Sequence, residues 1–268
     1  MKNITYIILA SSAIAVLFSC GSQPPAENPL KFELVTYQKQ SEGCDGVRDD
    51  NCAKIKIEFP QITSFSNEIV REKINKSITK LFSMNESDRS DAADFNTQMT
   101  GFIEEYESFI NEFPDAFQSW FIERTGEVKL NKGNIFSVDF MEYSYTGGAH
   151  PNTFVAFKNY NLTNGEEIRL DEIIHSGKQK ELTKIGEEQF RKIKNLTADA
   201  DLGEAGFWFE NNEFYLNDNF LITASSLVFY YNNYEITAYA FGPTELEIPF
   251  SKIESLVGES SLLRGLLR

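Results

Sequence analysis

Residues 135–162 read IFSVDFMEYSY, then TGGAHPN, then TFVAFKNYNL. The first run, which ends at Tyr145, repeats its apolar side chains with a period near two, and residues 153–162 form a second strand-like run. Gly147 and Gly148 lie between them, and glycine readily adopts the positive φ that the tip of a hairpin requires. We therefore expect two long strands of one sheet, joined by this turn.

The segments before this hairpin predict further strands and two helices. Strand patterns occupy residues 32–40, 53–59 and 128–130. Ser66 is the expected N-cap of the first helix, and the second helix ends before Pro114. The apolar positions at helical spacing, expected to face the core, are Ile69, Val70, Ile74, Ile78, Leu81 and Phe82, then Phe102, Ile103, Tyr106, Phe109, Ile110 and Phe113.

Helix and strand signals alternate again after the hairpin. The turn signal at residues 163–166 precedes a strand-like segment at 168–174, and residues 178–196 predict an amphipathic helix. Short aromatic strands are expected at 214–216, 220–223, 226–231 and 245–248, with a last short helix at 250–256. The pattern predicts an α+β fold with mostly antiparallel sheet and amphipathic helices.

The first residues are typical of a bacterial lipoprotein signal. Lys2 precedes the apolar stretch 4–18, and LFSCG at residues 17–21 places a cysteine where a lipobox requires one. We expect residues 1–19 to be a signal peptide, Cys20 to carry the lipid, and the proline-rich residues 20–29 to be a flexible tether. The alternative is an ordinary secretory signal with a coincidental cysteine. The expected location is the bacterial cell envelope, lipid-anchored and extracytoplasmic, on the periplasmic side or the surface.

The composition describes an acidic globular protein. Hydrophobic residues make up 41% of the chain, and the formal net charge is -15. Loss of residues 1–19 would remove one lysine and leave 24 basic against 40 acidic residues, a charge of -16. Such a surface repels nucleic acid and attracts cationic partners or metal ions, although it also serves solubility alone. We expect no nucleic-acid partner. The length suits one large domain or two small packed domains.

Two cysteines remain once Cys20 is lipidated. Cys44 and Cys52 enclose seven residues that include Gly, Asp and Asn, so their Cα atoms can approach to disulfide distance in an oxidising compartment. We expect a disulfide that closes the hairpin between strands 32–40 and 53–59. The aspartates of this loop do not follow the spacing of a known calcium loop, and no metal or other cofactor is expected.

Two motifs carry a resemblance to a known family. They are YSYTGGAHPN at residues 143–152 and YEITAYAFGP at 234–243, followed by LEIPFSKI at 246–253. In this order they resemble the domain pair found outside the membrane in the RsiV anti-sigma factor and before the catalytic domain of the peptidoglycan deacetylase PdaC. The resemblance implies an extracytoplasmic protein of two intimately packed small α+β domains. We expect an N-terminal domain at 30–162 and a C-terminal RsiV-like domain at 163–268.

The chain differs from both relatives in the segments through which those proteins signal or catalyse. RsiV senses lysozyme and signals through a membrane helix to a cytoplasmic sigma-binding segment, and PdaC uses a separate metal-dependent catalytic domain. Neither part is expected here. No nucleophile elbow, phosphate-binding loop or histidine cluster is visible, and His150 and His175 are the two histidines. We expect a protein that is not an enzyme, although a glycosidase pair of carboxylates would leave no sequence signal.

The candidate binding residues lie in the glycine-rich turn. They are Tyr145, Gly147, Gly148, His150 and Asn152. They either brace the hairpin or contact a ligand, and the sequence leaves both open. The expected function is a binding or sensing module for an extracytoplasmic protein or glycan, for example a lysozyme-like muramidase or peptidoglycan. The alternative is an envelope hydrolase that acts on peptidoglycan or polysaccharide.

Overall fold

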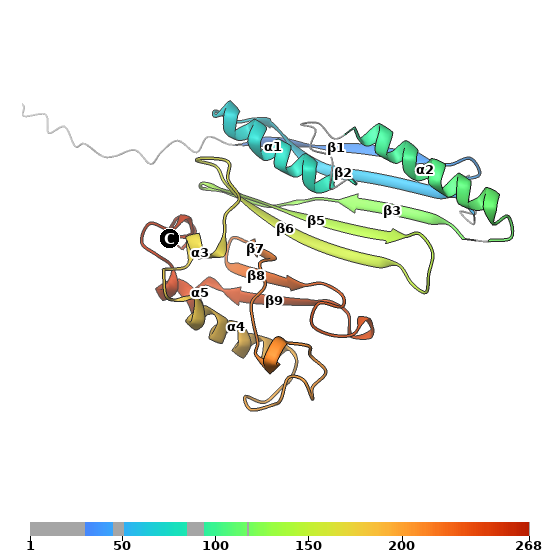
Figure 1. The fold of residues 1–268 in the computed structure, drawn as a ribbon. Helices are drawn as coiled ribbons and strands as arrows, with labels where there is room; N and C mark the ends of the chain where they lie inside the picture. The colour runs from blue at the N-terminus through green and yellow to red at the C-terminus, as the bar shows by residue number, and fades with distance from the viewer. Residues whose placement is uncertain (1–29, 45–50, 85–93, 117, 268) are drawn as a thin grey trace, which may run out of the picture.

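A computed structural model describes residues 30–44, 51–84, 94–116 and 118–267. The expected signal peptide, Cys20 and tether lie outside these residues. The chain has an α+β fold, as the sequence predicts, with one curled, mainly antiparallel sheet and a second, smaller sheet (Figure 1). Within the described ranges, no helix combines the length and apolarity needed to cross a membrane.

The large sheet contains six strands in the order β1-β2-β3-β5-β4, with β6 on the other side of β5. Their bounds are β1 Lys31–Gln40, β2 Ala53–Ser64, β3 Trp120–Thr125, β4 Val128–Lys132, β5 Ile135–Tyr145 and β6 Asn152–Asn161. Strands β2 and β3 are parallel, and the other paired strands are antiparallel. The expected long hairpin is β5–β6, in register from Ile135↔Asn161 to Ser144↔Asn152.

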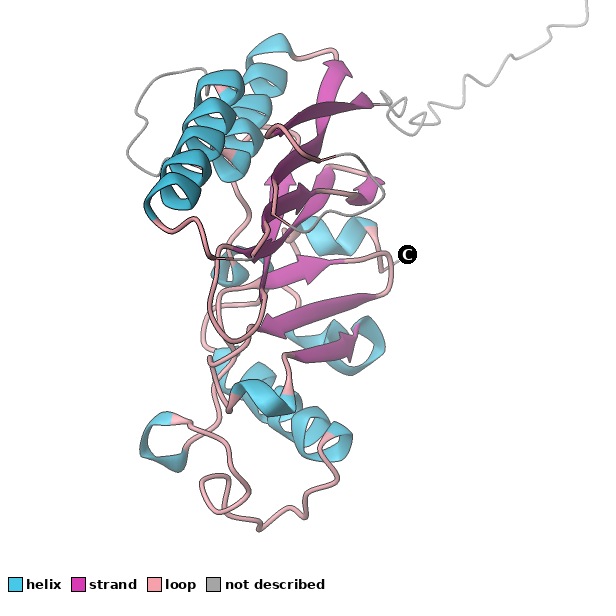
Figure 2. Cartoon of the chain, turned by 90° about the vertical axis from the view of Figure 1, so that its right-hand side faces the viewer, coloured by secondary structure: helices cyan, strands magenta, loops and turns pink. Residues whose placement is uncertain are grey.

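Two helices cover one face of this sheet, α1 (Glu68–Phe82) and α2 (Phe95–Glu112), as Figure 2 shows from the side. The N-cap of α1 is Asn67, one residue later than expected, and its side chain accepts a hydrogen bond from Val70 N. The expectation that Ile69 faces the core is wrong: the buried stripe runs through Val70 and Ile74, and Ile69, which lies outside it, is 79% exposed. The other apolar positions of α1 are buried or pack on the core, as the helical spacing predicts.

Strand β2 runs past Pro60, although the sequence suggested an end at Phe59. Proline has no N–H, so it fits a strand only where that position needs no donor. Pro60 faces Leu34 of β1, and the last residue of β2 that pairs with β3 is Glu58. The nitrogen of Pro60 therefore lies where β2 needs no hydrogen-bond donor.

The second sheet is formed by β7 (Phe220–Ile222), β8 (Ser226–Tyr231) and β9 (Thr244–Pro249), all antiparallel. Helix α4 (Gln179–Ile193) packs on β9, and α5 (Phe250–Ile253) follows it. Two strand expectations are wrong: residues 170–173 form the short helix α3, and residues 214–216 are irregular. The 3-10 turns are Glu210–Asn212, Tyr239–Phe241, Glu254–Leu256 and Leu262–Gly265.

Asparagine side chains join the second sheet to the edge of β6. The Asn232 amide accepts a hydrogen bond from Val155 N at 2.7 Å and donates to Val155 O at 2.9 Å. Asn219 accepts from Phe157 N at 2.8 Å and donates to Val155 O at 2.9 Å. These amides take the place of a neighbouring strand, because a carboxamide offers the same donor and acceptor as a peptide group.

Asn159 makes the reverse contact from β6. Its buried amide donates to Phe220 O at 2.7 Å and accepts from Ile222 N at 2.8 Å, so β7 is attached to β6 by a side chain. Leu130 and Ile135 of the large sheet also pack in the hydrophobic core of the second sheet. The two sheets are therefore intimately packed, and the geometry near β6 depends on both.

Candidate functional site

The turn between β5 and β6 has the backbone that its glycines predict. Gly147 and Gly148 have φ values of 107° and 103°, which side chains with a Cβ rarely adopt. The Tyr145 hydroxyl donates to Gly148 O at 2.9 Å and so closes the turn from within. A Cβ on Gly147 would lie 3.2 Å from the Gln118 side chain, whereas a Cβ on Gly148 would meet nothing within 4 Å.

His150 follows the glycines and is fixed by residues that lie far away in the sequence. Its Nδ1 lies 3.0 Å from Pro151 O, so the proton of the neutral ring belongs on Nδ1. The imidazole stacks on the Tyr239 ring, with centroids 3.7 Å apart and planes 15° from parallel. The Tyr239 hydroxyl donates to Pro151 O at 3.0 Å. Tyr239 thus holds both the ring and the backbone of the turn.

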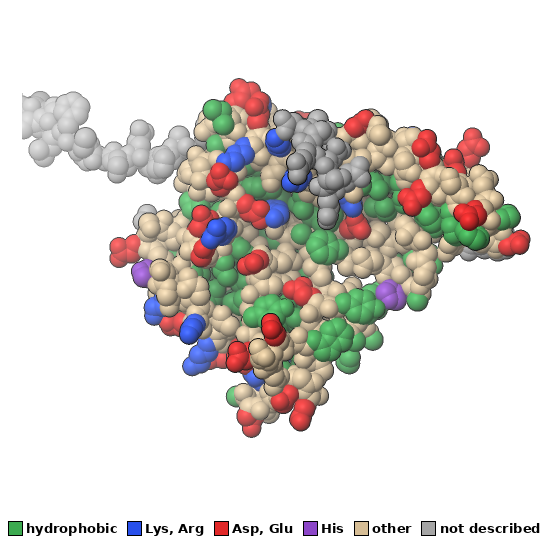
Figure 3. Space-filling model, viewed as in Figure 1, with side chains coloured by type: hydrophobic (Ala, Val, Ile, Leu, Met, Phe, Trp, Pro, Cys, Tyr) green, Lys and Arg blue, Asp and Glu red, His purple; other side chains and the backbone are tan. Residues whose placement is uncertain are grey.

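Tyr234 completes the group. Its hydroxyl lies 3.5 Å from His150 Nε2, and its ring is 5.6 Å from the Tyr239 ring. With the proton on Nδ1, Nε2 is an acceptor that faces a hydroxyl donor. We call His150, Tyr234 and Tyr239 the aromatic triad. In the space-filling view of Figure 3, a histidine on the right-hand side lies beside a group of hydrophobic side chains.

Tyr234 is displayed in an unusual backbone conformation. Its φ is 65°, and a bulky side chain in this region costs about 1–3 kcal/mol, so the conformation persists only where its surroundings enforce it. Glu235 provides that support: its carboxylate accepts from Asn232 N at 2.8 Å and from Asn217 Nδ2 at 2.6 Å. Because Asn232 also binds the edge of β6, the Tyr234 ring is held in place and remains 55% exposed.

The loop between α4 and β7 carries another exposed aromatic side chain, Trp208. Trp208 N donates to Ile236 O at 2.8 Å, and the Thr237 hydroxyl donates to Gly206 O at 3.1 Å. The Trp208 side chain is 55% exposed. Large exposed aromatic side chains on a fixed backbone are typical of recognition surfaces.

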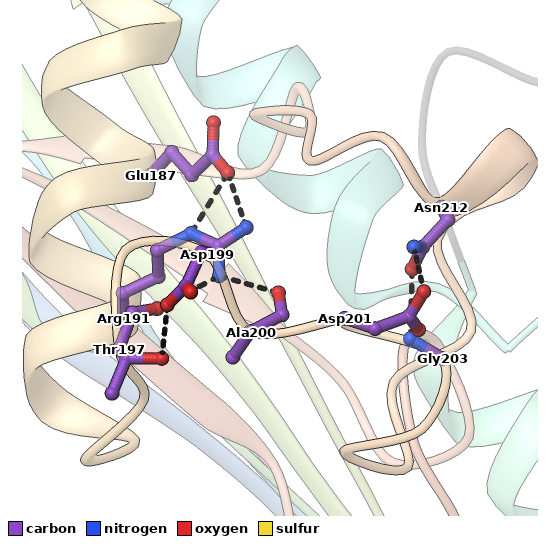
Figure 4. Close-up of polar contacts among 8 residues, drawn as sticks. All are labelled: Glu187, Arg191, Thr197, Asp199, Ala200, Asp201, Gly203 and Asn212. Carbon is purple, nitrogen blue, oxygen red and sulfur yellow. Dashed lines mark hydrogen bonds and ion pairs between the residues drawn. The ribbon is translucent and has the colours of Figure 1, made fainter.

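Two polar networks hold this loop, as the close-up in Figure 4 shows. Arg191 of α4 binds Glu187 through Nε and Nη2 and donates from Nη1 to Ala200 O at 2.8 Å. Asn212 donates to Asp201 at 2.8 Å and accepts from Gly203 N at 2.7 Å. The long connection is therefore an ordered support for Trp208.

Burial raises the pKa of two tyrosine hydroxyls, those of Tyr231 and Tyr215. The Tyr231 side chain is fully buried and its hydroxyl donates to Tyr215 O at 2.6 Å, so burial is the main cause of its raised pKa. Burial, and then the charge of Glu235, raises the pKa of Tyr215. The raised pKa values favour the protonated, neutral form of both hydroxyls.

The structure places the predicted site residues in different roles. His150 enters the aromatic triad, Tyr145 and Gly148 close the turn, and Asn152 is exposed at the start of β6. Tyr234 and Tyr239 were missed as site residues, although both belong to the quoted motif at 234–243. The signal that could have found them was the presence of two motifs in one chain, which suggests that they meet.

The predicted disulfide between Cys44 and Cys52 is confirmed, with a Cα–Cα distance of 5.5 Å. It closes the β1–β2 hairpin just beyond Gln40 and Ala53. Among the described residues, no group of three or more His, Cys, Asp or Glu is placed to hold a metal ion.

Comparison with known proteins places the triad at the junction of two family matches. Residues 47–153 match the family described as deacetylase PdaC, and residues 171–251 match DUF3298, a family of proteins of unknown function. The chain resembles a PdaC–DUF3298 domain pair. His150 lies in the first match, whereas Tyr234 and Tyr239 lie in the second. Such domains are of the extracytoplasmic type.

Two solved structures share the fold. A DUF3298 family member from Bacteroides fragilis superposes with a TM-score of 0.75 at 21% sequence identity, over 90% of this chain and 98% of that one. A DUF3298 family protein from Pseudomonas aeruginosa gives a TM-score of 0.62 at 17% identity, over 90% and 97%. No curated protein sequence matches this chain.

Proposed function

We propose that this chain is a binding or sensing module of the cell envelope that engages an extracytoplasmic ligand through the aromatic triad. One observation carries the proposal: the two family motifs, which lie more than eighty residues apart in the sequence, meet in the stack of His150 on Tyr239. A turn that only closed a hairpin would need no aromatic partner from the other half of the chain. The strained and exposed Tyr234 supports the same conclusion.

The chemistry of the surface favours recognition. The contacts of the triad involve phenol, imidazole and backbone carbonyl groups, which can stack on a ligand and donate or accept hydrogen bonds. The ligand is an extracytoplasmic protein or glycan, and a cationic muramidase is the first candidate because the chain is strongly acidic. An envelope hydrolase, the alternative, would require carboxylates that converge beside the turn.

The two histidines provide a matched test. Both are exposed, and in both Nδ1 contacts the next carbonyl oxygen, Pro151 O at 3.0 Å and Ser176 O at 2.8 Å. His150 is the one that stacks on Tyr239. We expect His150→Ala to weaken binding of a muramidase or of soluble peptidoglycan fragments by about tenfold, about 1.4 kcal/mol, and His175→Ala to leave it unchanged.

Titration calorimetry with both probes measures this difference, with the melting temperature recorded for each variant. Equal binding by the two histidine variants would contradict the proposal. Release of soluble fragments from peptidoglycan by the wild type would favour the hydrolase. For a muramidase, association is expected to slow as salt rises, because charges are screened beyond about 8 Å at physiological ionic strength.

The proposed anchor has its own test. Cys20 is the thiol of the lipobox, so Cys20→Ser is expected to abolish acylation and to move the protein out of the membrane fraction. Labelling with radioactive palmitate and membrane fractionation measure both effects. Continued labelling of the variant would contradict the proposed lipid anchor without affecting the proposal for the triad.

A further inference from the structure

Strand β1 is an outer edge of the large sheet. It is ten residues long, pairs with β2 on one side, and has an exposed or half-buried side chain at every position. Its apolar residues include Leu34, which is 56% exposed, and Phe32, which is 37% exposed. A long edge strand with exposed apolar side chains is a template for another strand, and natural proteins usually cover or interrupt such an edge.

The unpaired backbone groups of β1 follow from the ladder geometry. Ser41 N donates to Ala53 O at 2.9 Å, directly after the pair Gln40↔Lys54. Hydrogen-bonded positions alternate along an antiparallel ladder, so the odd-numbered residues of β1 form the backbone hydrogen bonds with β2. Even-numbered residues therefore direct N–H and C=O groups away from the sheet. Among the described residues, no backbone hydrogen bond to Leu34, Thr36 or Gln38 is found on that side.

A second copy of β1 can pair with this edge in a small number of registers. A two-fold antiparallel pair must join even-numbered positions to even-numbered positions, because these carry the free groups. A pair centred on Thr36 places Glu33 opposite the partner's Lys39 at both ends and Val35 opposite the partner's Tyr37. A pair centred on Val35 would instead oppose Lys31 to the partner's Lys39, two like charges.

We propose that two copies of this chain associate through their β1 strands in the register centred on Thr36. Each copy contributes the same strand, which makes the interface isologous and closed. Glu33 has no ion pair among the described residues, and Lys39 donates to the Thr100 hydroxyl on the helix side of the sheet. Charged residues on an edge normally resist pairing, but here Glu33 and Lys39 are self-complementary in the register centred on Thr36 and favour it.

The register predicts which cysteine variants cross-link. In a hydrogen-bonded antiparallel pair the Cα atoms are about 5.5 Å apart, which suits a disulfide. Thr36→Cys is therefore expected to form a covalent dimer on mild oxidation of the full-length protein in its membrane. In this register Leu34 faces the partner's Gln38, four positions from the partner's residue 34. The two thiols of Leu34→Cys would therefore lie about 13 Å apart along the strands, and no covalent dimer is expected. Both side chains are exposed, so the two variants are matched for folding.

Charge reversal tests the same register independently. Glu33→Lys places a lysine opposite the partner's Lys39 and is expected to reduce cross-linking through Thr36→Cys. Glu33→Lys combined with Lys39→Glu restores opposite charges and is expected to recover it. Equal cross-linking through positions 34 and 36, absence of a dimer in Thr36→Cys, or failure of the double reversal to recover cross-linking would each overturn the proposal.

Discussion

The two long hairpins of the large sheet are closed in different ways. The β1–β2 hairpin is closed by the disulfide between Cys44 and Cys52, eight positions apart in the sequence. The β5–β6 hairpin is closed at its tip by Tyr145 from within and by Tyr239 from the other half of the chain. The first closure is local and covalent, whereas the second depends on how the two halves of the protein pack.

Under the proposed function, this difference separates stability from recognition. A local crosslink acts mainly on the unfolded chain and leaves the rest of the native structure as it was. The contacts at the β5–β6 tip join residues of both family matches into one exposed surface. Changes at the disulfide are therefore expected to alter stability without altering binding, and changes at the aromatic triad are expected to alter binding more than stability.

The largest loss of stability is expected from Cys44→Ala with Cys52→Ala. A sequence separation of eight residues closes a short loop, and its removal should lower the free energy of unfolding by about 2.5 kcal/mol if chain entropy dominates. Urea unfolding measures this loss, and reduction of the wild type is the control. Ligand binding at the triad is expected to persist, so its loss with the disulfide would break the contrast between the hairpins.

Gly148→Val is expected to have the next largest effect. Space for the side chain is present, so the cost is the positive φ alone, about 1–3 kcal/mol for a residue forced into this region. Gly101→Val is the matched control, because this exposed helical position has room for a Cβ and no positive φ, and its effect should be a few tenths of a kcal/mol. Thermal unfolding compares the two, and equal losses would refute the role assigned to Gly148.

Tyr239→Phe tests the long-range closure with a smaller change. The variant keeps the ring that stacks on His150 and removes the hydroxyl that donates to Pro151 O, a loss of about 1 kcal/mol for a single hydrogen bond. Tyr37→Phe, at a half-buried position of β1, is the control for loss of a tyrosine hydroxyl in general. An identical stability change in both variants would mean that Tyr239 does not hold the turn.

Local patterns in the sequence predict much of the fold. The β5–β6 hairpin, the helices, the disulfide and most strands of the second sheet follow from periodicity, glycine placement and cysteine spacing. Strand β3 was missed because Arg124 occupies one of its inward positions. Its guanidinium lies 2.6 Å from Glu142, and these side chains are 14% and 19% exposed. A half-buried ion pair on the inward face hides the alternation that marks a strand.

The candidate site was predictable only in part, for a similar reason. The glycines and His150 were visible because they form a compact motif within one turn. Tyr239 became a site residue through packing between the two halves, and no local pattern encodes that contact. The amides of Asn219 and Asn232, which bind the edge of β6, attach the second half of the chain to the hairpin that carries His150.

The most direct test of the account is a double-mutant cycle between His150 and Tyr239. His150→Ala, Tyr239→Ala and the double variant are compared by the free energy of urea unfolding, with His175→Ala and Tyr239→Ala as the control pair. A stacked pair is expected to give a coupling energy of about 0.5–1.5 kcal/mol, and the control pair should be additive within about 0.3 kcal/mol. Additive effects of His150→Ala and Tyr239→Ala would contradict the claim that the two halves of the chain build one site.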